Sequence, residues 1–234
     1  MNIAEIGLNH LGSITYLNSY IKKIAKTNVD AVTIQILKKE DLIKKKLSFC
    51  YLSPHDIDLF ICKIKKINKK VGLALGDKST IENLKYLKKI DFFKILSKDF
   101  NNQKLIKFIL LKTTANIYLS TGYADEKDIN FLLKKIKFFK NRIFLIYTDF
   151  NKNLKITNLI NIELMKRKFN CKIAYGNHSH NKKMIIYSKI YNPESIFFYV
   201  KNNLRKFKKF IFPDHFYALN VNELENYIKK IKTI

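Results

Sequence analysis

The stretch Ile3–Ser13, with the sequence IAEIGLNHLGS, shows the pattern that organises the whole chain. It begins as a short apolar strand that contains Glu5, and it ends in a glycine-containing turn that holds Asn9 and His10. In α/β proteins, the loops that leave the carboxyl ends of parallel strands line the crevice in which ligands bind. The stretch therefore predicts a first strand that carries functional groups at its end. A first strand whose Asn9 and His10 only cap the next helix is the alternative.

An apolar run that ends in glycine or polar residues recurs down the chain. The pattern predicts further strands over residues 30–37, 71–76, 92–97, 116–120, 142–148, 172–175 and 195–200. It predicts helices over residues 14–27, 53–69, 79–89, 101–113, 124–140, 156–169, 182–191 and 221–232, with a charged connection over 38–50 and a basic one over 201–212. Eight strands that alternate with eight helices predict a single closed (β/α)8 TIM barrel over residues 1–234. A doubly wound open sheet is the alternative.

Composition restricts the class of protein further. A hydrophobic share of 47% excludes a disordered chain. No uncharged apolar run approaches the roughly 18 residues that a membrane span requires, and Glu5 interrupts any signal-peptide pattern at the N-terminus. The three cysteines, Cys50, Cys62 and Cys171, are odd in number and have no metal-type spacing. We therefore expect a reduced, cytoplasmic protein with no membrane partner.

The charge is strongly basic, with a formal net charge of +26. Only three of the 45 basic residues are arginine, the residue that nucleic-acid readers favour for bidentate contacts. The excess of Lys, Ile, Asn, Phe and Tyr is typical of codon bias in an A/T-rich genome. We expect lysines on the outer faces of most helices and no specific nucleic-acid partner. A general attraction for anionic ligands remains.

Six segments, taken in order, resemble the sialic acid synthase family. They are the opening stretch, Asp30–Gln35, Lys94–Ser97, Leu119–Gly122, Tyr175–His178 and Pro213–Phe216. The resemblance implies a (β/α)8 barrel that condenses phosphoenolpyruvate with an N-acetylated aldose of the N-acetylmannosamine type to form nonulosonic acids. It also implies a divalent metal, manganese or magnesium, at the carboxyl ends of the strands, and it leaves a homodimer possible. Most members add an antifreeze-like C-terminal domain. We expect this chain to be a single barrel domain without it.

The resemblance assigns a phosphoenolpyruvate site and an acidic group beside the reacting centre. Lys94, Ser97 and Ser120 match the groups that hold the phosphate and carboxylate of phosphoenolpyruvate, and an ammonium with two hydroxyls suits such an anion. Glu5 matches the acidic residue, where a carboxylate positions or deprotonates water or orients the sugar. The alternative for Glu5 is a buried carboxylate that only pairs with a lysine.

The resemblance also assigns sugar contacts and a metal ligand. Gln35, Asp99 and Asp214 match residues that contact the sugar. His178 matches one of the family's two metal-binding histidines, although a lone histidine at a strand end is usually a hydrogen-bonded loop residue. His180 is expected to face solvent.

Five departures from the family pattern weaken the assignment. Thr33 replaces a lysine that binds phosphoenolpyruvate, Asp149 replaces an asparagine, and Gly76–Ser79 replaces a Ser-Thr-Pro-Phe segment. Gly176–His178 replaces Ser-Asp-His. Phe197–Tyr199 replaces the segment with the second metal-binding histidine, and a neutral tyrosine is a poor substitute ligand.

Three hypotheses follow from this pattern. The first is a sialic acid synthase-type enzyme whose metal is weakly held. The second is a degenerate barrel that binds a sugar, a phosphate or a partner protein without turnover. The third is a basic protein that binds polyanions through charge alone. The ordered retention of Glu5, Gln35, Lys94, Ser120 and Asp214 favours the first two hypotheses over the third.

Overall fold

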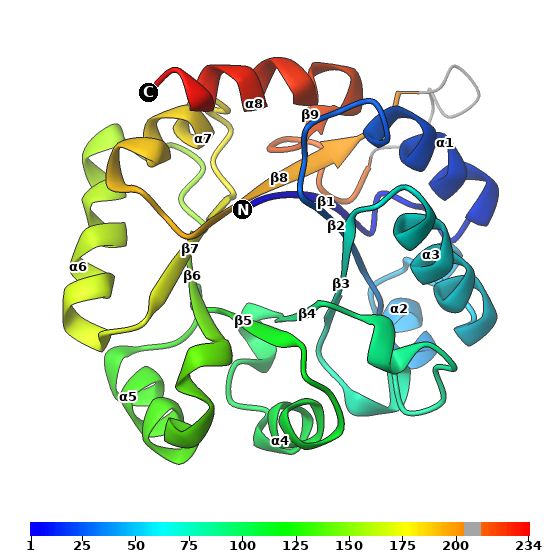
Figure 1. Ribbon diagram of the computed structural model, residues 1–234, viewed down its shortest axis with the longest axis horizontal. Coiled ribbons are helices and arrows are strands. Elements are labelled where there is room, and N and C mark those ends of the chain that lie inside the picture. The colour runs from blue at the N-terminus through cyan, green and yellow to red at the C-terminus, as the bar shows by residue number, and fades with distance from the viewer. Residues whose placement is uncertain (204–211) are drawn as a thin grey trace.

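Eight parallel strands form a closed barrel in the computed structural model, which describes residues 1–203 and 212–234. The strands follow one another in sequence order around the barrel, and the pairing of the first with the eighth closes it (Figure 1). They are β1 (Asn2–Gly7), β2 (Ala31–Gln35), β3 (Lys70–Leu75), β4 (Phe92–Ile95), β5 (Asn116–Ser120), β6 (Ile143–Asp149), β7 (Lys172–Asn177) and β8 (Ser195–Lys201). A two-residue strand, β9 (Leu219–Asn220), pairs with the end of β8. The predicted (β/α)8 barrel is confirmed, and the open sheet is excluded.

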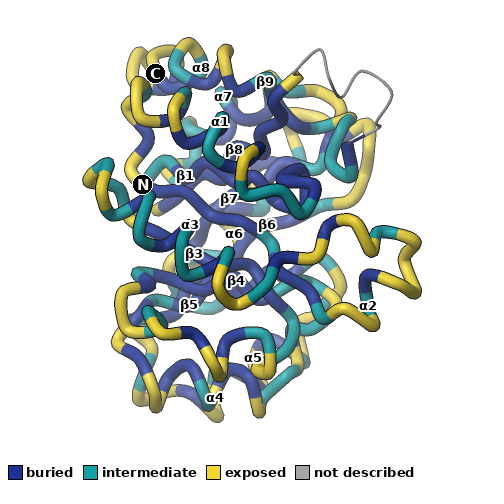
Figure 2. The backbone as a smooth tube through the Cα atoms, turned by 90° about the vertical axis from the view of Figure 1, so that its right-hand side faces the viewer, coloured by how far each residue is buried: buried dark blue, intermediate teal, exposed yellow. Residues whose placement is uncertain are grey.

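Helices surround the strands on the outside of the barrel (Figure 1). They are α1 (Ile14–Ile24), α2 (Lys39–Lys44), α3 (Pro54–Lys66), α4 (Gln103–Lys112), α5 (Glu126–Lys135), α6 (Asn161–Phe169), α7 (Met184–Tyr187) and α8 (Leu224–Lys232). Ser13 caps α1, and Ser53 forms a capping box with Asp56 at the start of α3. Figure 2 shows the consequence for burial: the strands are buried apart from a few residues at their ends, such as Lys70 and Lys172, and most exposed residues lie in loops and helices.

The helix expected over residues 79–89 is absent, and that prediction was wrong. The segment forms two short 3-10 turns, Lys78–Thr80 and Leu87–Lys89. The carboxylate of Asp58 on α3 accepts hydrogen bonds from the backbone N–H groups of Lys85 and Tyr86, at 3.1 and 3.0 Å. These two N–H groups cannot also donate to carbonyl groups within a helix. The segment is therefore held against α3 in a non-helical conformation.

Two other segments differ from expectation in detail. The charged connection over residues 38–50 contains α2 and a 3-10 turn, and residues 182–191 hold only the short α7 followed by another 3-10 turn. Most of the basic connection expected over residues 201–212 lies outside the described residues.

The barrel interior below the carboxyl ends of the strands is filled by aromatic rings. Phe92, Tyr118, Phe144 and Phe197 pack with ring centroids 4.5–6.4 Å apart. The Tyr118 hydroxyl is 2.8 Å from the Ser195 hydroxyl, which satisfies both buried groups. This plug closes the barrel from below, so the polar side chains that point inward above it lie on a dry, apolar floor.

The surface carries most of the positive charge. Exposed lysines occur on α1, α2, α3, α4, α5, α6 and α8, which confirms the expected spread over outer helix faces.

Cys50, Cys62 and Cys171 are free thiols. Among the described residues, no helix combines the length and the apolar character that crossing a membrane demands.

Candidate functional site

A buried ion pair lies at the centre of the barrel mouth. Parallel pairing of β1 with β8 sets Glu5 beside Tyr199, and Lys94 reaches both of them from β4. The ammonium of Lys94 lies 3.1 Å from Glu5 Oε2 and 2.8 Å from the Tyr199 hydroxyl. Burial lowers the pKa of Lys94, but the Glu5 charge and the Tyr199 contact outweigh it, so the net shift is upward. The pairing of Glu5 with a buried lysine is thus observed, and its partner is the lysine expected to bind phosphoenolpyruvate.

His178 follows β7 and meets the same tyrosine. Its Nε2 lies 2.9 Å from the Tyr199 hydroxyl. Lys94 can only donate, so the tyrosine oxygen accepts from it and the hydroxyl proton is left for His178 Nε2. Burial, assisted by the nearby charge of Lys94, lowers the pKa of His178 to about 3, so the imidazole is neutral and able to accept that proton. Lys94 therefore donates to both Glu5 and Tyr199, and Tyr199 donates in turn to His178, so the four side chains form one connected hydrogen-bond network.

Asp214 lies in the loop after β8 and faces Glu5 across Gly7. Gly7 has φ +59°, and a Cβ there would collide with the Asp214 carboxylate. The Tyr217 hydroxyl donates to Asp214 Oδ1. Burial raises the pKa of Asp214 to about 6, with a further contribution from the Glu5 charge, against the opposing effects of Tyr217 and Lys94. The site therefore holds, in addition to Glu5, the carboxyl group of Asp214, and Asp214 can change protonation state near neutral pH.

Asn9 and His10 hold the mouth together rather than contacting a ligand or capping α1. The Asn9 amide donates to the Val200 carbonyl at 2.9 Å and accepts from the Asp214 N–H at 3.1 Å. His10 accepts from the Gly12 N–H at 3.0 Å, so its other nitrogen donates to the Gln35 carbonyl at 2.9 Å. Both ring nitrogens are occupied, which excludes His10 as a metal ligand in this arrangement.

A row of hydroxyl groups crosses three neighbouring strand ends. Ser97 donates to Ser120 at 2.9 Å, and Ser120 lies 3.1 Å from Thr148 on β6. On the other side of Glu5, the Thr33 hydroxyl is buried in the barrel interior and makes no hydrogen bond to any residue that the structure describes. An unsatisfied buried hydroxyl is uncommon in native proteins and points to a missing polar partner such as a ligand or water.

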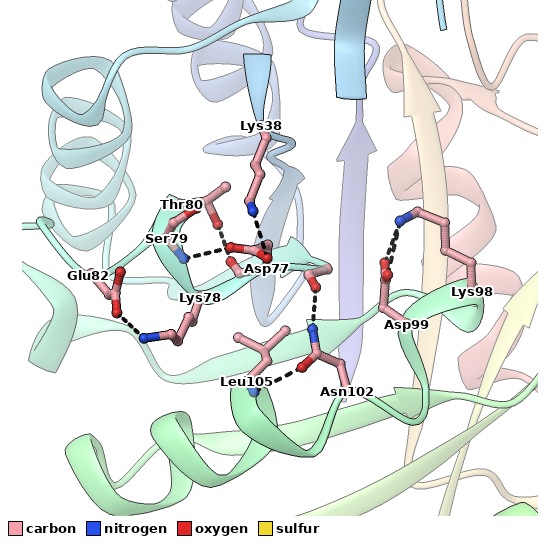
Figure 3. Close-up of polar contacts among 11 residues, drawn as sticks. Lys38, Asp77, Lys78, Ser79, Thr80, Glu82, Lys98, Asp99, Asn102 and Leu105 are labelled. Carbon is pink, nitrogen blue, oxygen red and sulfur yellow. Dashed lines mark hydrogen bonds and ion pairs between the residues drawn. The ribbon is translucent and has the colours of Figure 1, made fainter. Parts of the chain in front are cut away.

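Asp99 and Gln35 lie at the same end of the barrel but make no contact with the ion pair in the described structure. The Asp99 carboxylate packs over Gly76 and pairs with Lys98 at 2.8 Å, while Asn102 donates to the Gly76 carbonyl at 2.8 Å (Figure 3). Gln35 ends β2, and its carbonyl is the group that His10 binds.

The departures Asp149 and Asn177 do not place new polar groups in the barrel interior. Asp149 accepts from the Asn151 N–H at 2.8 Å and from the Tyr147 hydroxyl at 3.4 Å, and Tyr147 packs in the outer core. Asn177 bonds within its own loop to Ser179 and to Tyr175. Asp149 and Asn177 each lie two positions after a tyrosine of the outer core, Tyr147 and Tyr175. Residues two apart in a strand share a face, so both point away from the barrel interior.

The donor groups at the mouth do not fit a resident divalent cation. Among the described residues, no group of three or more His, Cys, Asp or Glu side chains is arranged to hold a metal ion. The one imidazole at the centre, His178, already accepts the hydroxyl proton of Tyr199. Manganese and magnesium prefer several oxygen ligands in near-octahedral geometry, and the Lys94 ammonium would repel the ion. The side chains at the mouth therefore do not suit the metal that the resemblance implies.

The sequence comparison decides the family. The sequence profile of the NeuB family matches residues 61–234, which is well over half of the chain. The chain belongs to the NeuB family. Glu5 and Gln35 precede the matched range, so their place in the site rests on the barrel geometry. The resemblance to sialic acid synthases is confirmed.

Similar sequences include a protein named as a pseudaminic acid synthase. A pseudaminic acid synthase of Campylobacter jejuni is 29% identical over 199 residues, covering 76% of this chain and 58% of the relative. An uncharacterized protein of Methanocaldococcus jannaschii is 29% identical over 190 residues, covering 76% of this chain and 55% of the relative. The chain thus spans less than two thirds of the length of these relatives.

Solved structures of other proteins share the fold. The sialic acid synthetase of Leptospira borgpetersenii, solved with citrate, has a TM-score of 0.86 at 20% identity and covers 99% of this chain and 82% of its own. A spore coat polysaccharide biosynthesis protein of Bacillus subtilis has a TM-score of 0.81 at 20% identity, covering 100% and 67%. At this identity the match shows the barrel architecture alone.

Sequence reasoning missed three participants in the site. Tyr199 was treated only as the loss of a histidine, although its period-two spacing from Phe197 shows that both face the barrel interior. Thr148 extends the hydroxyl row, and the same alternation along β6 could have revealed it. Tyr217 lies in an irregular loop, where no periodic signal exists.

Proposed function

We propose that this chain is a sugar-acid synthase that condenses phosphoenolpyruvate with an N-acetylated aldose of the N-acetylmannosamine type. The observation that supports this best is the buried Glu5–Lys94 pair at the mouth of a NeuB-family barrel, flanked by hydroxyl groups on one side and by Asp214 on the other. The third hypothesis, binding of polyanions through charge alone, gives no reason for such an interior cluster.

The phosphoenolpyruvate anion is assigned to Lys94 and the hydroxyl row. An ammonium has three N–H donors, and Glu5 and Tyr199 occupy two of them, so one remains to reach a phosphate or carboxylate oxygen. Ser97, Ser120 and Thr148 supply neutral donors beside it. Hydrogen bonds to a charged acceptor are about twice as strong as neutral ones, and the aromatic floor excludes water that would weaken them.

The aldose is assigned to the side of the mouth formed by Asp214, Gln35 and Thr33. Asp214, with a pKa raised to about 6, can accept hydrogen bonds from sugar hydroxyls when ionised and donate one when protonated. The unsatisfied Thr33 hydroxyl gains a partner when a polar ligand enters. Glu5 lies between the two halves of the site and orients the ligand groups that meet there. Asp99 is a further proposed sugar contact, which requires its carboxylate to leave Lys98.

Release of inorganic phosphate tests the proposal. The purified chain is incubated with phosphoenolpyruvate and a panel of N-acetylated aldoses that includes N-acetylmannosamine, once with manganese and once with EDTA. Phosphate release that requires the aldose is expected in at least one condition, and Glu5→Gln should abolish it while Glu40→Gln, on the exposed helix α2, should not. Release without the aldose, or equal release by Glu5→Gln, would contradict the proposal.

A non-catalytic binding barrel is the second candidate. The central network favours it, because two of the three Lys94 donors and His178 Nε2 already have partners within the protein. Calorimetric binding of phosphoenolpyruvate without any phosphate release would support this candidate against the enzyme.

A further inference from the structure

We propose that the site acts without a divalent cation, and that the Tyr199 hydroxyl supplies the hydrogen bond to the carbonyl oxygen of the aldehyde substrate. The inference rests on the proposed function for its chemical role. Whether the site excludes a divalent cation does not depend on that function, because cation binding can be measured without substrates or turnover. Tyr199 occupies the strand position at which the family carries a metal-binding histidine, so one residue accounts for both parts of the proposal.

Most of the side-chain atoms that a cation would need at the centre of the mouth are already engaged. His178 Nε2 accepts the Tyr199 proton at 2.9 Å. Glu5 accepts from the Gly7 N–H through Oε1 at 3.0 Å and from Lys94 through Oε2 at 3.1 Å. Asp214 Oδ1 accepts from Tyr217, which leaves its Oδ2 as the remaining carboxylate oxygen of this cluster. One oxygen is far short of the ligand number that manganese or magnesium requires.

Three aromatic rings pack around His178. The rings of Tyr217, Tyr199 and Phe150 lie 4.6, 4.8 and 5.0 Å from the imidazole, centroid to centroid. A cation held by few protein groups must complete its shell with water, and three packed rings oppose this. The positive charge of Lys94, 2.8 Å from the tyrosine oxygen, adds electrostatic repulsion.

The same contacts prepare Tyr199 to act as a proton donor. Burial raises the pKa of Tyr199 to about 12, and the ammonium of Lys94, which donates to the tyrosine oxygen, opposes that rise by stabilising negative charge on the oxygen. His178 holds the hydroxyl proton until a carbonyl oxygen replaces it as acceptor. A hydrogen bond aimed at the oxygen on which charge develops is the main source of stabilisation in this kind of addition.

The reaction balances with Tyr199 as the acid. The electron pair of the phosphoenolpyruvate C2–C3 double bond forms the bond to the aldehyde carbon, and the carbonyl pair moves to oxygen, which takes the Tyr199 proton. Water adds to C2 and returns a proton to the phenolate that Lys94 has stabilised. The C2–O bond to phosphate then breaks, and the new C2 hydroxyl gives its proton to the departing phosphate as C2 becomes a ketone.

Manganese binding to the EDTA-treated full chain tests the exclusion directly. The loss of the free Mn²⁺ signal in electron paramagnetic resonance measures binding without substrate. The wild-type chain should give no saturable binding, and Tyr199→His should gain a saturable site that His178→Ala removes. Saturable binding by the wild-type chain that His178→Ala abolishes would overturn the proposal, as would a Tyr199→His variant that folds normally but gains no site.

Turnover tests the role of the hydroxyl and separates this proposal from the proposed function. EDTA should leave kcat unchanged, and Tyr199→Phe should lower kcat by about 10²–10⁴-fold while the KM for phosphoenolpyruvate stays close to wild type. Activity that requires manganese, or a Tyr199→Phe variant with wild-type kcat, would refute the role of the hydroxyl while the synthase function stands. If no aldose supports turnover, the proposed function fails, and the role of the hydroxyl fails with it. Manganese binding then still decides the exclusion of the cation.

Discussion

Removing one partner of the Glu5–Lys94 pair should destabilise the fold strongly. The two side chains are 1% and 6% exposed, and their charged atoms lie 3.1 Å apart. At an effective dielectric constant of about 20, their attraction is on the order of 5 kcal/mol. Lys94→Met leaves the Glu5 carboxylate buried without its cation, and breaking a buried pair in this way costs about 3–5 kcal/mol. For a chain of this size the melting temperature should fall by roughly 10 °C.

Urea unfolding followed by circular dichroism at neutral pH measures the loss. The double variant Glu5→Gln/Lys94→Met should recover part of it, because neither charge is then left alone. Lys65→Met is the matched control. Lys65 and Asp91 lie closer together, at 2.6 Å, but they are 36% and 28% exposed, so the loss should be no more than about 1 kcal/mol. A Lys94→Met variant within about 1 kcal/mol of the wild type would refute the buried, tightly coupled pair.

Three further predictions concern the rest of the mouth and the surface. The pKa of Asp214 is about 6 in the folded chain against an ordinary value of 3.8. Its contribution to stability is therefore present at acid pH and is lost as pH rises through about 6. Asp214→Asn should flatten that part of the profile of unfolding free energy against pH, measured by urea titration. Ser120→Ala should raise the KM for phosphoenolpyruvate about 10–100-fold in steady-state kinetics, the range expected for one hydrogen bond to a charged group, with exposed Ser48→Ala as the unaffected control. Binding to duplex DNA should be weak and steeply salt-dependent, since the lysines are spread around the barrel, and tight sequence-selective binding at physiological salt in fluorescence anisotropy would contradict this.

The sequence predicts the barrel well because its signals are local and repeated. Each β/α unit carries its own apolar strand and its own turn residues, so errors in single units leave the architecture unchanged. The helix expected over residues 79–89 failed because Asp58, which lies in a different helix, takes its backbone donors. Such a contact between distant segments leaves no mark in the local pattern.

The sequence predicted that several candidate residues meet at one barrel mouth, but not how they are connected. Glu5, Lys94 and Ser120 lie on predicted strands whose carboxyl ends meet at one edge of a barrel, while the roles of Lys94 and Ser120 come from the family resemblance. The hydrogen bonds that link Lys94 to Tyr199 and Tyr199 to His178 depend on how far along the barrel axis each side chain lies. That position is determined by the register between neighbouring strands, which the local sequence does not show. Reading Phe197–Tyr199 as the loss of a metal ligand therefore missed that the tyrosine joins the network.

The formation of a carbon–carbon bond tests the central claim most directly. Phosphoenolpyruvate labelled with ¹³C at C3 is incubated with the chain and the aldose that supports phosphate release, and the products are followed by nuclear magnetic resonance. The account predicts that the vinyl carbon signal is replaced by that of an sp³ methylene carbon bonded to the former aldehyde carbon. Labelled pyruvate as the only product, or an unchanged vinyl signal with every aldose, would contradict it.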